Sequence, residues 1–166
     1  MYRMRACLTV AVLLTTFPAA ADNSLVILTD PNSLNATELT IAGSGNGLSI
    51  LQEVPLSAAV TNKVRVSLTG DRNGGPVGST FTSAALSSGL MPGTLTQRGQ
   101  GNMMSLDVIG SSNLFAMLQQ GDGNTIVGSI SGIGNQAAVQ QFGGNNFASF
   151  SQTGMGNNVS ITQRSR

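Results

Sequence analysis

The chain has 166 residues, a formal net charge of +1, no histidine, no tryptophan and one cysteine, Cys7. Charged residues make up 9% of it, against roughly 25% in typical soluble domains. Without histidine or further cysteines, the usual nucleophile–base pairs and transition-metal sites are missing, so we expect neither an enzyme nor a metal or cofactor site. A basic patch and stacking aromatic residues are also missing, which argues against nucleic-acid binding.

Residues 1–21 have the pattern of a signal peptide. Two arginines precede an almost wholly apolar stretch, residues 6–17, and a proline and three alanines then form a cleavage site. The apolar stretch is shorter than the roughly 20 residues of a membrane-spanning helix, so we predict no transmembrane segment. We expect an exported protein that starts at Asp22. Because Cys7, the one cysteine, lies in the removed segment, we expect the exported protein to contain no cysteine and therefore no disulfide.

Residues 22–90 contain a degenerate repeat. Two units are predicted, at 35–52 and 62–79, each with two strands joined by a short link that contains glycine. The second strand of the second unit is 73–79, and a weak strand at 91–97 opens the regular part. Longer connections, 53–61 and 80–90, separate these units from the regular part of the chain. An alternative treats 22–90 as a separate recognition or secretion region that carries a short assembling tail. Deleting this region and measuring export and polymerisation separately would distinguish the two readings.

Residues 91–166 contain a regular repeat in which Gln-x-Gly-x-x-Asn recurs at a constant interval. The glycines are Gly99, Gly110, Gly121, Gly132, Gly143 and Gly154. The asparagines are Asn102, Asn113, Asn124, Asn135, Asn146 and Asn157. The leading position holds Gln97, Val108, Gln119, Ile130, Gln141, Gln152 and Gln163. Because every second leading residue is a glutamine, the predicted unit spans two of these intervals and has two halves.

Each half consists of a seven-residue segment and a four-residue link. Seven residues are a common strand length, and a link with glycine at its second place is a tight turn. Alternate positions of the segments are mostly apolar, as in Phe115 and Met117, whereas a helix would have an apolar period of 3.6. Strands with one apolar face can bury it by pairing into strand–turn–strand arches that stack. The predicted fold class is all-β: a β-solenoid of about five and a half 22-residue units, cross-β on assembly.

Stacking one unit on the next would place like residues above one another. We predict self-assembly ladders made of the six asparagines and of Gln97, Gln119, Gln141, Gln152 and Gln163, whose amides can hydrogen-bond along the axis. The alternative is that these residues only cap turns in a monomeric solenoid. No capping element follows Gln163, and we therefore expect an open end that favours assembly.

Three aspartates interrupt the neutral repeats: Asp71, Asp107 and Asp122. Stacked like charges oppose the addition of a strand, so these residues are candidate gatekeepers that slow premature polymerisation. Ordinary solvated charges in turns are the alternative. Calcium-binding solenoids need an aspartate in every turn, whereas only Asp71 and Asp122 lie in predicted turns here.

The pattern Gln-x-Gly-x-x-Asn, with glutamine six residues further on, resembles the curlin repeat of bacterial curli subunits, most closely over 135–163. The resemblance covers 91–163 clearly and 35–79 faintly. Asparagine opens strands where the family usually has serine, and Val108 and Ile130 stand where it usually has glutamine. The resemblance implies a secreted, self-polymerising subunit of functional amyloid fibres on the bacterial cell surface, which supports adhesion and the biofilm matrix.

The implied partners are further copies of the chain and a second curlin subunit. An outer-membrane secretion pore and a periplasmic chaperone would belong to its export route. Major-subunit and minor-nucleator types both stay open. The competing hypothesis is a soluble, secreted β-solenoid binding module, adhesin-like or ice-binding, that stays monomeric. An ice-binding face needs a regular row of threonines, and the outward positions here are mixed, as Leu114, Thr125 and Gln136 show.

Overall fold

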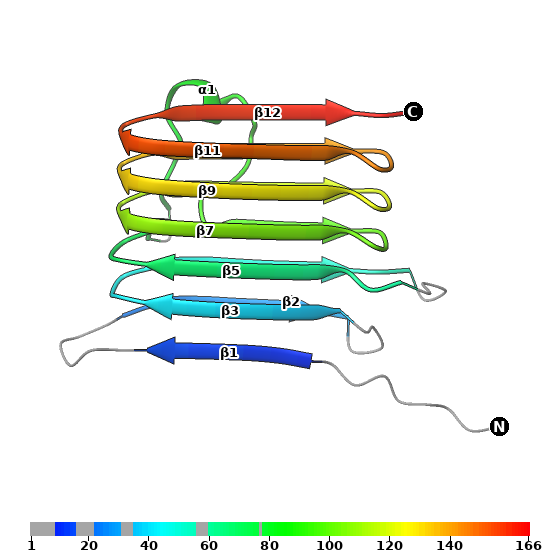
Figure 1. Ribbon diagram of the computed structural model, residues 1–166, viewed down its shortest axis with the longest axis horizontal. Coiled ribbons are helices and arrows are strands. Elements are labelled where there is room, and N and C mark those ends of the chain that lie inside the picture. Colours follow the sequence, from blue (N-terminus) through cyan, green and yellow to red (C-terminus); the bar gives the residue numbers. More distant parts are fainter. Residues whose placement is uncertain (1–8, 16–21, 31–34, 56–59, 77) are drawn as a thin grey trace.

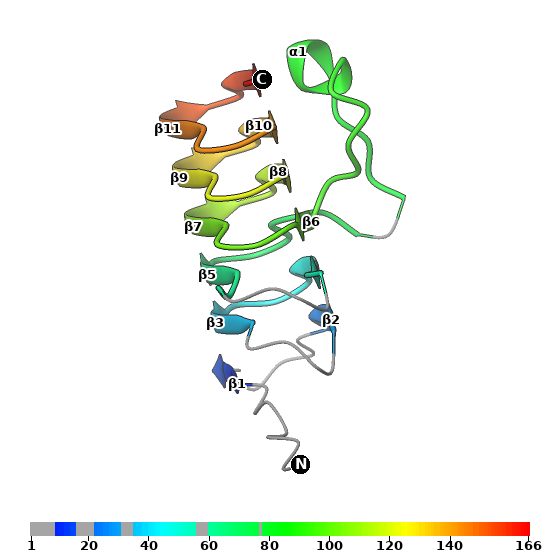
Figure 2. The same cartoon turned by 90° about the vertical axis from the view of Figure 1, so that its right-hand side faces the viewer.

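The computed structural model describes residues 9–15, 22–30, 35–55, 60–76 and 78–166. Nearly all of its regular structure is β, as predicted. Two parallel sheets of six strands face each other, and consecutive strands alternate between them (Figure 1, Figure 2). No helix in the described residues is long and apolar enough to span a membrane.

The first sheet, sheet A, has the strand order β1-β3-β5-β7-β9-β11. Its strands are β1 (Thr9–Thr15), β3 (Ala36–Ala42), β5 (Lys63–Thr69), β7 (Met103–Ser111), β9 (Thr125–Ile133) and β11 (Phe147–Met155). Sheet B has the order β12-β10-β8-β6-β4-β2. Its strands are β2 (Ser24–Thr29), β4 (Gly47–Glu53), β6 (Thr94–Arg98), β8 (Leu114–Gln120), β10 (Gln136–Phe142) and β12 (Asn158–Arg164). The one helix described is α1 (Ser83–Leu86).

The core lies between the two sheets and is built from alternate residues of each strand. The predicted inward residues Phe115 and Met117 are buried, whereas Val159 and Ile161 of the outermost strand β12 are partly buried. Large and small side chains compensate between layers. A Cβ added to Gly128 would lie 2.5 Å from the Phe150 ring, so the absence of a side chain at 128 makes room for this ring. The alternation seen in the sequence therefore sets which face of each strand is inside.

Two strands lie outside the predicted set. β2 pairs with β4 in sheet B. β1 falls within the predicted signal peptide and pairs with β3, from Thr9 opposite Ala36 to Thr15 opposite Ala42. Removal of residues 1–21 on export stays a prediction, and it would uncover the edge of β3.

The predicted strand at 73–79 is not formed by the described residues of that range. Asn73 and Gly74 do occupy the first positions of a sheet B strand, because Gly74 N donates to Asn113 O at 2.7 Å. The chain then leaves the sheet at Gly75 and Pro76, and Gly93 N resumes the pairing by donating to Phe115 O at 2.7 Å. Proline lacks an amide donor and Gly75 has a φ of +78°, so the strand cannot continue there. The predicted strands 73–79 and 91–97 are therefore one interrupted strand.

The interruption is a long excursion, described at residues 75–76 and 78–92, that we call the strap. It carries α1 and runs along the outer face of sheet B toward β12 (Figure 2). The strap explains why equivalent residues on its two sides are further apart than in the regular repeat: Asn73 and Asn113 are 40 residues apart, while Asn113 and Asn135 are 22 apart.

Candidate functional site

Two columns of asparagines run along the stack where the chain enters the strands. The sheet B column contains Asn23, Asn46, Asn73, Asn113, Asn135 and Asn157, and the sheet A column contains Asn35, Asn62, Asn102, Asn124 and Asn146. In each step a backbone amide donates to Oδ1 of the preceding asparagine, as from Asn135 N to Asn113 Oδ1 at 3.0 Å. The Nδ2 group also satisfies a link carbonyl of the next layer, as from Asn113 to Gly132 O at 2.9 Å. All six predicted asparagines belong to these columns.

A glutamine ladder runs along the other end of the sheet B strands. It contains Gln52, Gln97, Gln119, Gln141 and Gln163, and each Nε2 donates to the next Oε1 at 2.7–3.0 Å. The same Nε2 group donates to a carbonyl across the core, as from Gln119 to Met103 O at 3.0 Å. Because every donor faces the following layer, the ladder is polar, and one end of it differs chemically from the other.

The predicted ladder does not include Gln52, because its distance in sequence from Gln97 differs from the regular interval. It lies 45 residues before Gln97, whereas regular neighbours are 22 apart. The strap and the longer connection at 53–61 account for the difference. A search that allows insertions between equivalent positions would have found it.

Gln152 does not belong to the glutamine ladder, and this corrects the prediction. It lies on β11 in sheet A, next to Ile130, in a column that is otherwise apolar. Its Nε2 donates to Gln136 O at 3.0 Å, but its Oε1 is buried without a hydrogen-bond partner in the described structure. The cause is the alternation of strands, since a glutamine half a unit after Gln141 enters the opposite sheet.

The six predicted link glycines all have positive φ, from +92° at Gly143 to +131° at Gly132. The links also stack without room for a side chain, because a Cβ on Gly110 would collide with the carbonyl of Gly132. The backbone conformation favours glycine at all six positions, and at each of them except Gly154 an added Cβ would also collide with a backbone carbonyl of the next layer. Both constraints are structural and involve no ligand.

Two of the three candidate gatekeepers connect neighbouring layers. Asp71 Oδ1 accepts hydrogen bonds from Ser44 N at 2.8 Å and Ser44 Oγ at 2.9 Å, and these bonds lower the pKa of the Asp71 carboxyl. Asp122 Oδ1 accepts from Gln100 N at 2.9 Å. Asp107 lies exposed on β7, opposite Ser129. Within one folded chain the Asp71 and Asp122 carboxylates hold neighbouring links together. A role as gatekeepers stays a prediction for all three aspartates.

Residues 132–164 match a family model described as the curlin associated repeat. This stretch contains β10, β11 and β12 with their asparagines and with Gln141 and Gln163. The match confirms the resemblance to curlin-repeat proteins, and it does not distinguish a major subunit from a nucleator. No curated protein matches the chain at a significant level.

Proposed function

We propose that this chain, which carries the curlin associated repeat in its C-terminal part, is a secreted subunit that polymerises end to end into curli-like functional amyloid fibres. On the bacterial surface these fibres support adhesion and the biofilm matrix. The observation that carries the proposal is the polarity of the ladders. Each layer offers the next one a set of donors and acceptors that the next layer can use, so a second copy can continue the series.

The outermost strands of sheet B, β2 and β12, have complementary groups at the end of the glutamine column. Gln163 Nε2 donates to Phe147 O at 2.8 Å and is the last donor of the described ladder. Thr29 occupies the same column on β2, and its Oγ1 is buried without a hydrogen-bond partner in the described structure. If β2 of one copy stacks on β12 of another, Thr29 takes the position next to Gln163 that the next glutamine takes in the earlier layers.

The same register matches groups at both ends of the strands. Asn157 Oδ1 would accept the backbone amide of Asn23, continuing the asparagine column. Asp30 follows β2 directly and takes the position beside Glu53, which itself forms a 2.8 Å ion pair with Arg98 of the next layer. Stacking would therefore set Arg164 of one copy beside Asp30 of the next. Sheet B begins with β2 whether or not residues 1–21 are removed, so the sheet B contact of this junction does not depend on β1.

In the fibre the alternating strands would act as stacked arches of a β-solenoid that continues from copy to copy through sheet B. Further copies of the chain are the first partner. A second curlin subunit, a secretion pore and a periplasmic chaperone belong to the proposal through the family resemblance. The second candidate function is a soluble, monomeric binding module with the same fold.

A thioflavin-T time course on residues 22–166, released from denaturant, tests the proposal. We expect a lag, then growth, and fibres with a diffraction spacing of about 4.7 Å along the axis. A chain that stays monomeric and β-rich for days would support the binding module instead.

The proposed junction predicts an effect of charge reversal. Arg164→Asp places two carboxylates against each other at every junction, so elongation should slow about threefold at low salt. Adding Asp30→Arg to this variant should restore the rate, because the pair is then re-formed with its charges exchanged. Arg166→Asp is the matched control, since it changes the net charge equally outside the strands. If the double variant elongates as slowly as the single one, β2 does not stack on β12 in this register.

A further inference from the structure

The strap packs against the outer face of sheet B, well beyond the strand from which it leaves. Phe81 and Ala85 are buried against Ala116 of β8 and Ala138 of β10. These two alanines point away from the main core, and their small side chains leave room for the strap. The outer face of sheet B is therefore covered over β8 and β10.

Hydrogen bonds extend this contact to β12. Gln136 and Thr82 exchange two bonds of 2.7 Å, and Gln140 Nε2 donates to Ser88 O at 2.9 Å. Asn158 of β12 accepts from Ala85 N at 2.9 Å and donates to Thr82 O at 2.8 Å. Gln136, Gln140 and Asn158 point outward from sheet B, and their side-chain amides are the hydrogen-bond partners of the strap. They hold α1 against the outermost strand of sheet B.

The helix extends past that strand. In both views α1 rises beyond β12 at the C-terminal end of the stack (Figure 1, Figure 2). Leu86, in the last position of α1, is 59% exposed. A strand added to β12 would consequently have α1 next to its outer face.

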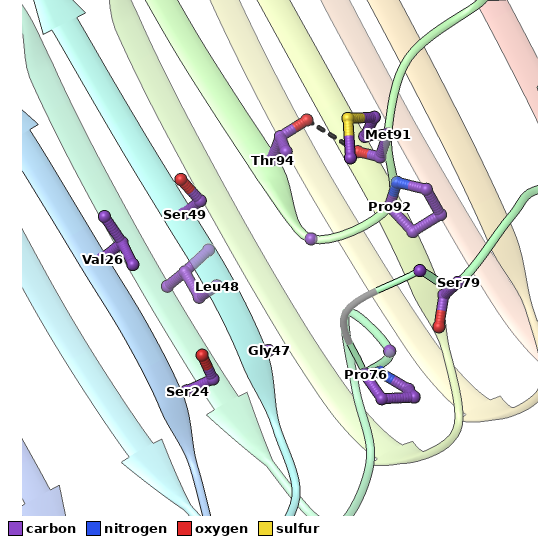
Figure 3. A pocket seen from close by; sticks show the side chains of 13 residues that line it. Ser24, Val26, Gly47, Leu48, Ser49, Pro76, Ser79, Met91, Pro92 and Thr94 are labelled. Atoms are coloured by element: carbon purple, nitrogen blue, oxygen red, sulfur yellow. Dashed lines mark hydrogen bonds between the residues drawn. The ribbon is translucent and has the colours of Figure 1, made fainter.

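The opposite end of sheet B has a groove on the same face. The groove has a volume of ≈ 330 Å³ and lies between β2 and β4 on one side and the two ends of the strap on the other. Figure 3 shows Val26 and Ser49 on the strands, with Pro76, Met91 and Pro92 of the strap across from them. Val26 is 46% exposed there, because the strap of the same chain runs the other way, toward β12.

We propose that the strap of one copy docks on β2 of the next copy, with Leu86 packed beside Val26 in this groove. Val26 precedes Ser49 in the sheet B column that continues through Thr94 to Ala116 and Ala138. The strap already covers Ala116 and Ala138 of that column, so docking on Val26 extends a contact that the chain makes with itself. This inference rests on the proposed end-to-end assembly and adds a second contact at each junction. The strap thus selects a second copy of this chain as its partner.

Cysteine cross-linking in the fibre tests the docking separately from the assembly. Residues 22–166 contain no cysteine, so Leu86→Cys and Val26→Cys chains can be copolymerised and treated with a short bis-maleimide. We expect covalent dimers in fibres and none in monomers. A mixture of Ser160→Cys and Val26→Cys chains reports the stacking of β12 on β2 alone. Leu86→Cys with Val127→Cys, on the exposed face of sheet A, is the control for random contact.

The outcomes separate the two proposals. If the 160–26 pair cross-links and the 86–26 pair does not, the strap does not dock and end-to-end assembly stands. If neither pair cross-links, or if a 160–49 pair forms instead, β2 is not the strand that stacks on β12, and both the junction and the docking are overturned.

Fibre stability gives a second readout. Leu86→Asp should raise the monomer concentration left at equilibrium roughly tenfold, because the buried leucine contact at each junction is lost. The circular dichroism of the monomer should not change, since Leu86 is exposed in the single chain. Ala84→Asp is the matched control, with the same added charge at another exposed position of α1. Equal monomer concentrations for Leu86→Asp and the unmodified chain would overturn the docking.

Discussion

Replacing Gln119 by leucine should lower the free energy of unfolding by about 3–5 kcal/mol. Gln119 is fully buried, accepts a hydrogen bond from Gln97 and donates to Gln141 and to the Met103 carbonyl. Leucine fills a similar volume but removes all three hydrogen bonds, and although Gln97 Nε2 keeps its bond to Lys63 O, a buried polar group that loses its partner costs about 1–3 kcal/mol. Denaturant unfolding of the monomer, followed by circular dichroism before fibres form, measures the loss.

Two controls isolate the ladder. Gln120→Leu changes the neighbouring exposed residue and should alter stability by no more than about 0.5 kcal/mol. Gln152→Leu makes the same exchange in the apolar column of sheet A, where Oε1 already lacks a partner in the described structure. It should cost much less than Gln119→Leu, since one hydrogen bond is lost and a buried unsatisfied oxygen is removed with it. Equal losses at 119 and 152 would show that the ladder does not carry the stability.

Replacing Gly132 by alanine should destabilise the chain by about 3 kcal/mol or more. The backbone at Gly132 has a φ of +131°, which side chains rarely adopt, and its added Cβ would collide with the carbonyl of Gly154 in the next layer. The links at Gly132 and Gly154 would have to move apart, and this would strain the pairing of β9 with β11, to which both glycines belong. Thermal unfolding followed by circular dichroism would report the loss.

Gly134→Ala is the matched control, further along the same link. Gly134 also has a positive φ, +67°, but an added Cβ meets no atom of the described residues within 4 Å. Only the backbone preference is lost there, at a cost of about 1–2 kcal/mol. If the two variants unfold at the same temperature, the close stacking of links contributes nothing measurable.

The amino-acid sequence determined the strands and the columns of the regular part. Alternation of apolar and polar residues decides which face of a strand is buried, and this information is local. A constant offset of 22 residues then places like residues in neighbouring layers, so the asparagine columns and most of the glutamine ladder could be predicted. The link glycines were equally predictable, because positive φ is a local requirement.

Only the tertiary structure decided which positions are equivalent where the offset changes. Residues 73–79 alternate like a strand. However, Gly74 pairs with Asn113, directly before the distant strand β8, and Gly93 pairs with Phe115 of β8, which leaves the strap between them outside the sheet. The sheet in which Gln152 lies is decided by the alternation of consecutive strands between sheet A and sheet B. The packing of the strap on sheet B of its own chain depends on Ala138 and Asn158, which come several strands later in the chain. In each case the deciding partner is distant in sequence, and a local pattern carries no information about which distant strand will supply it.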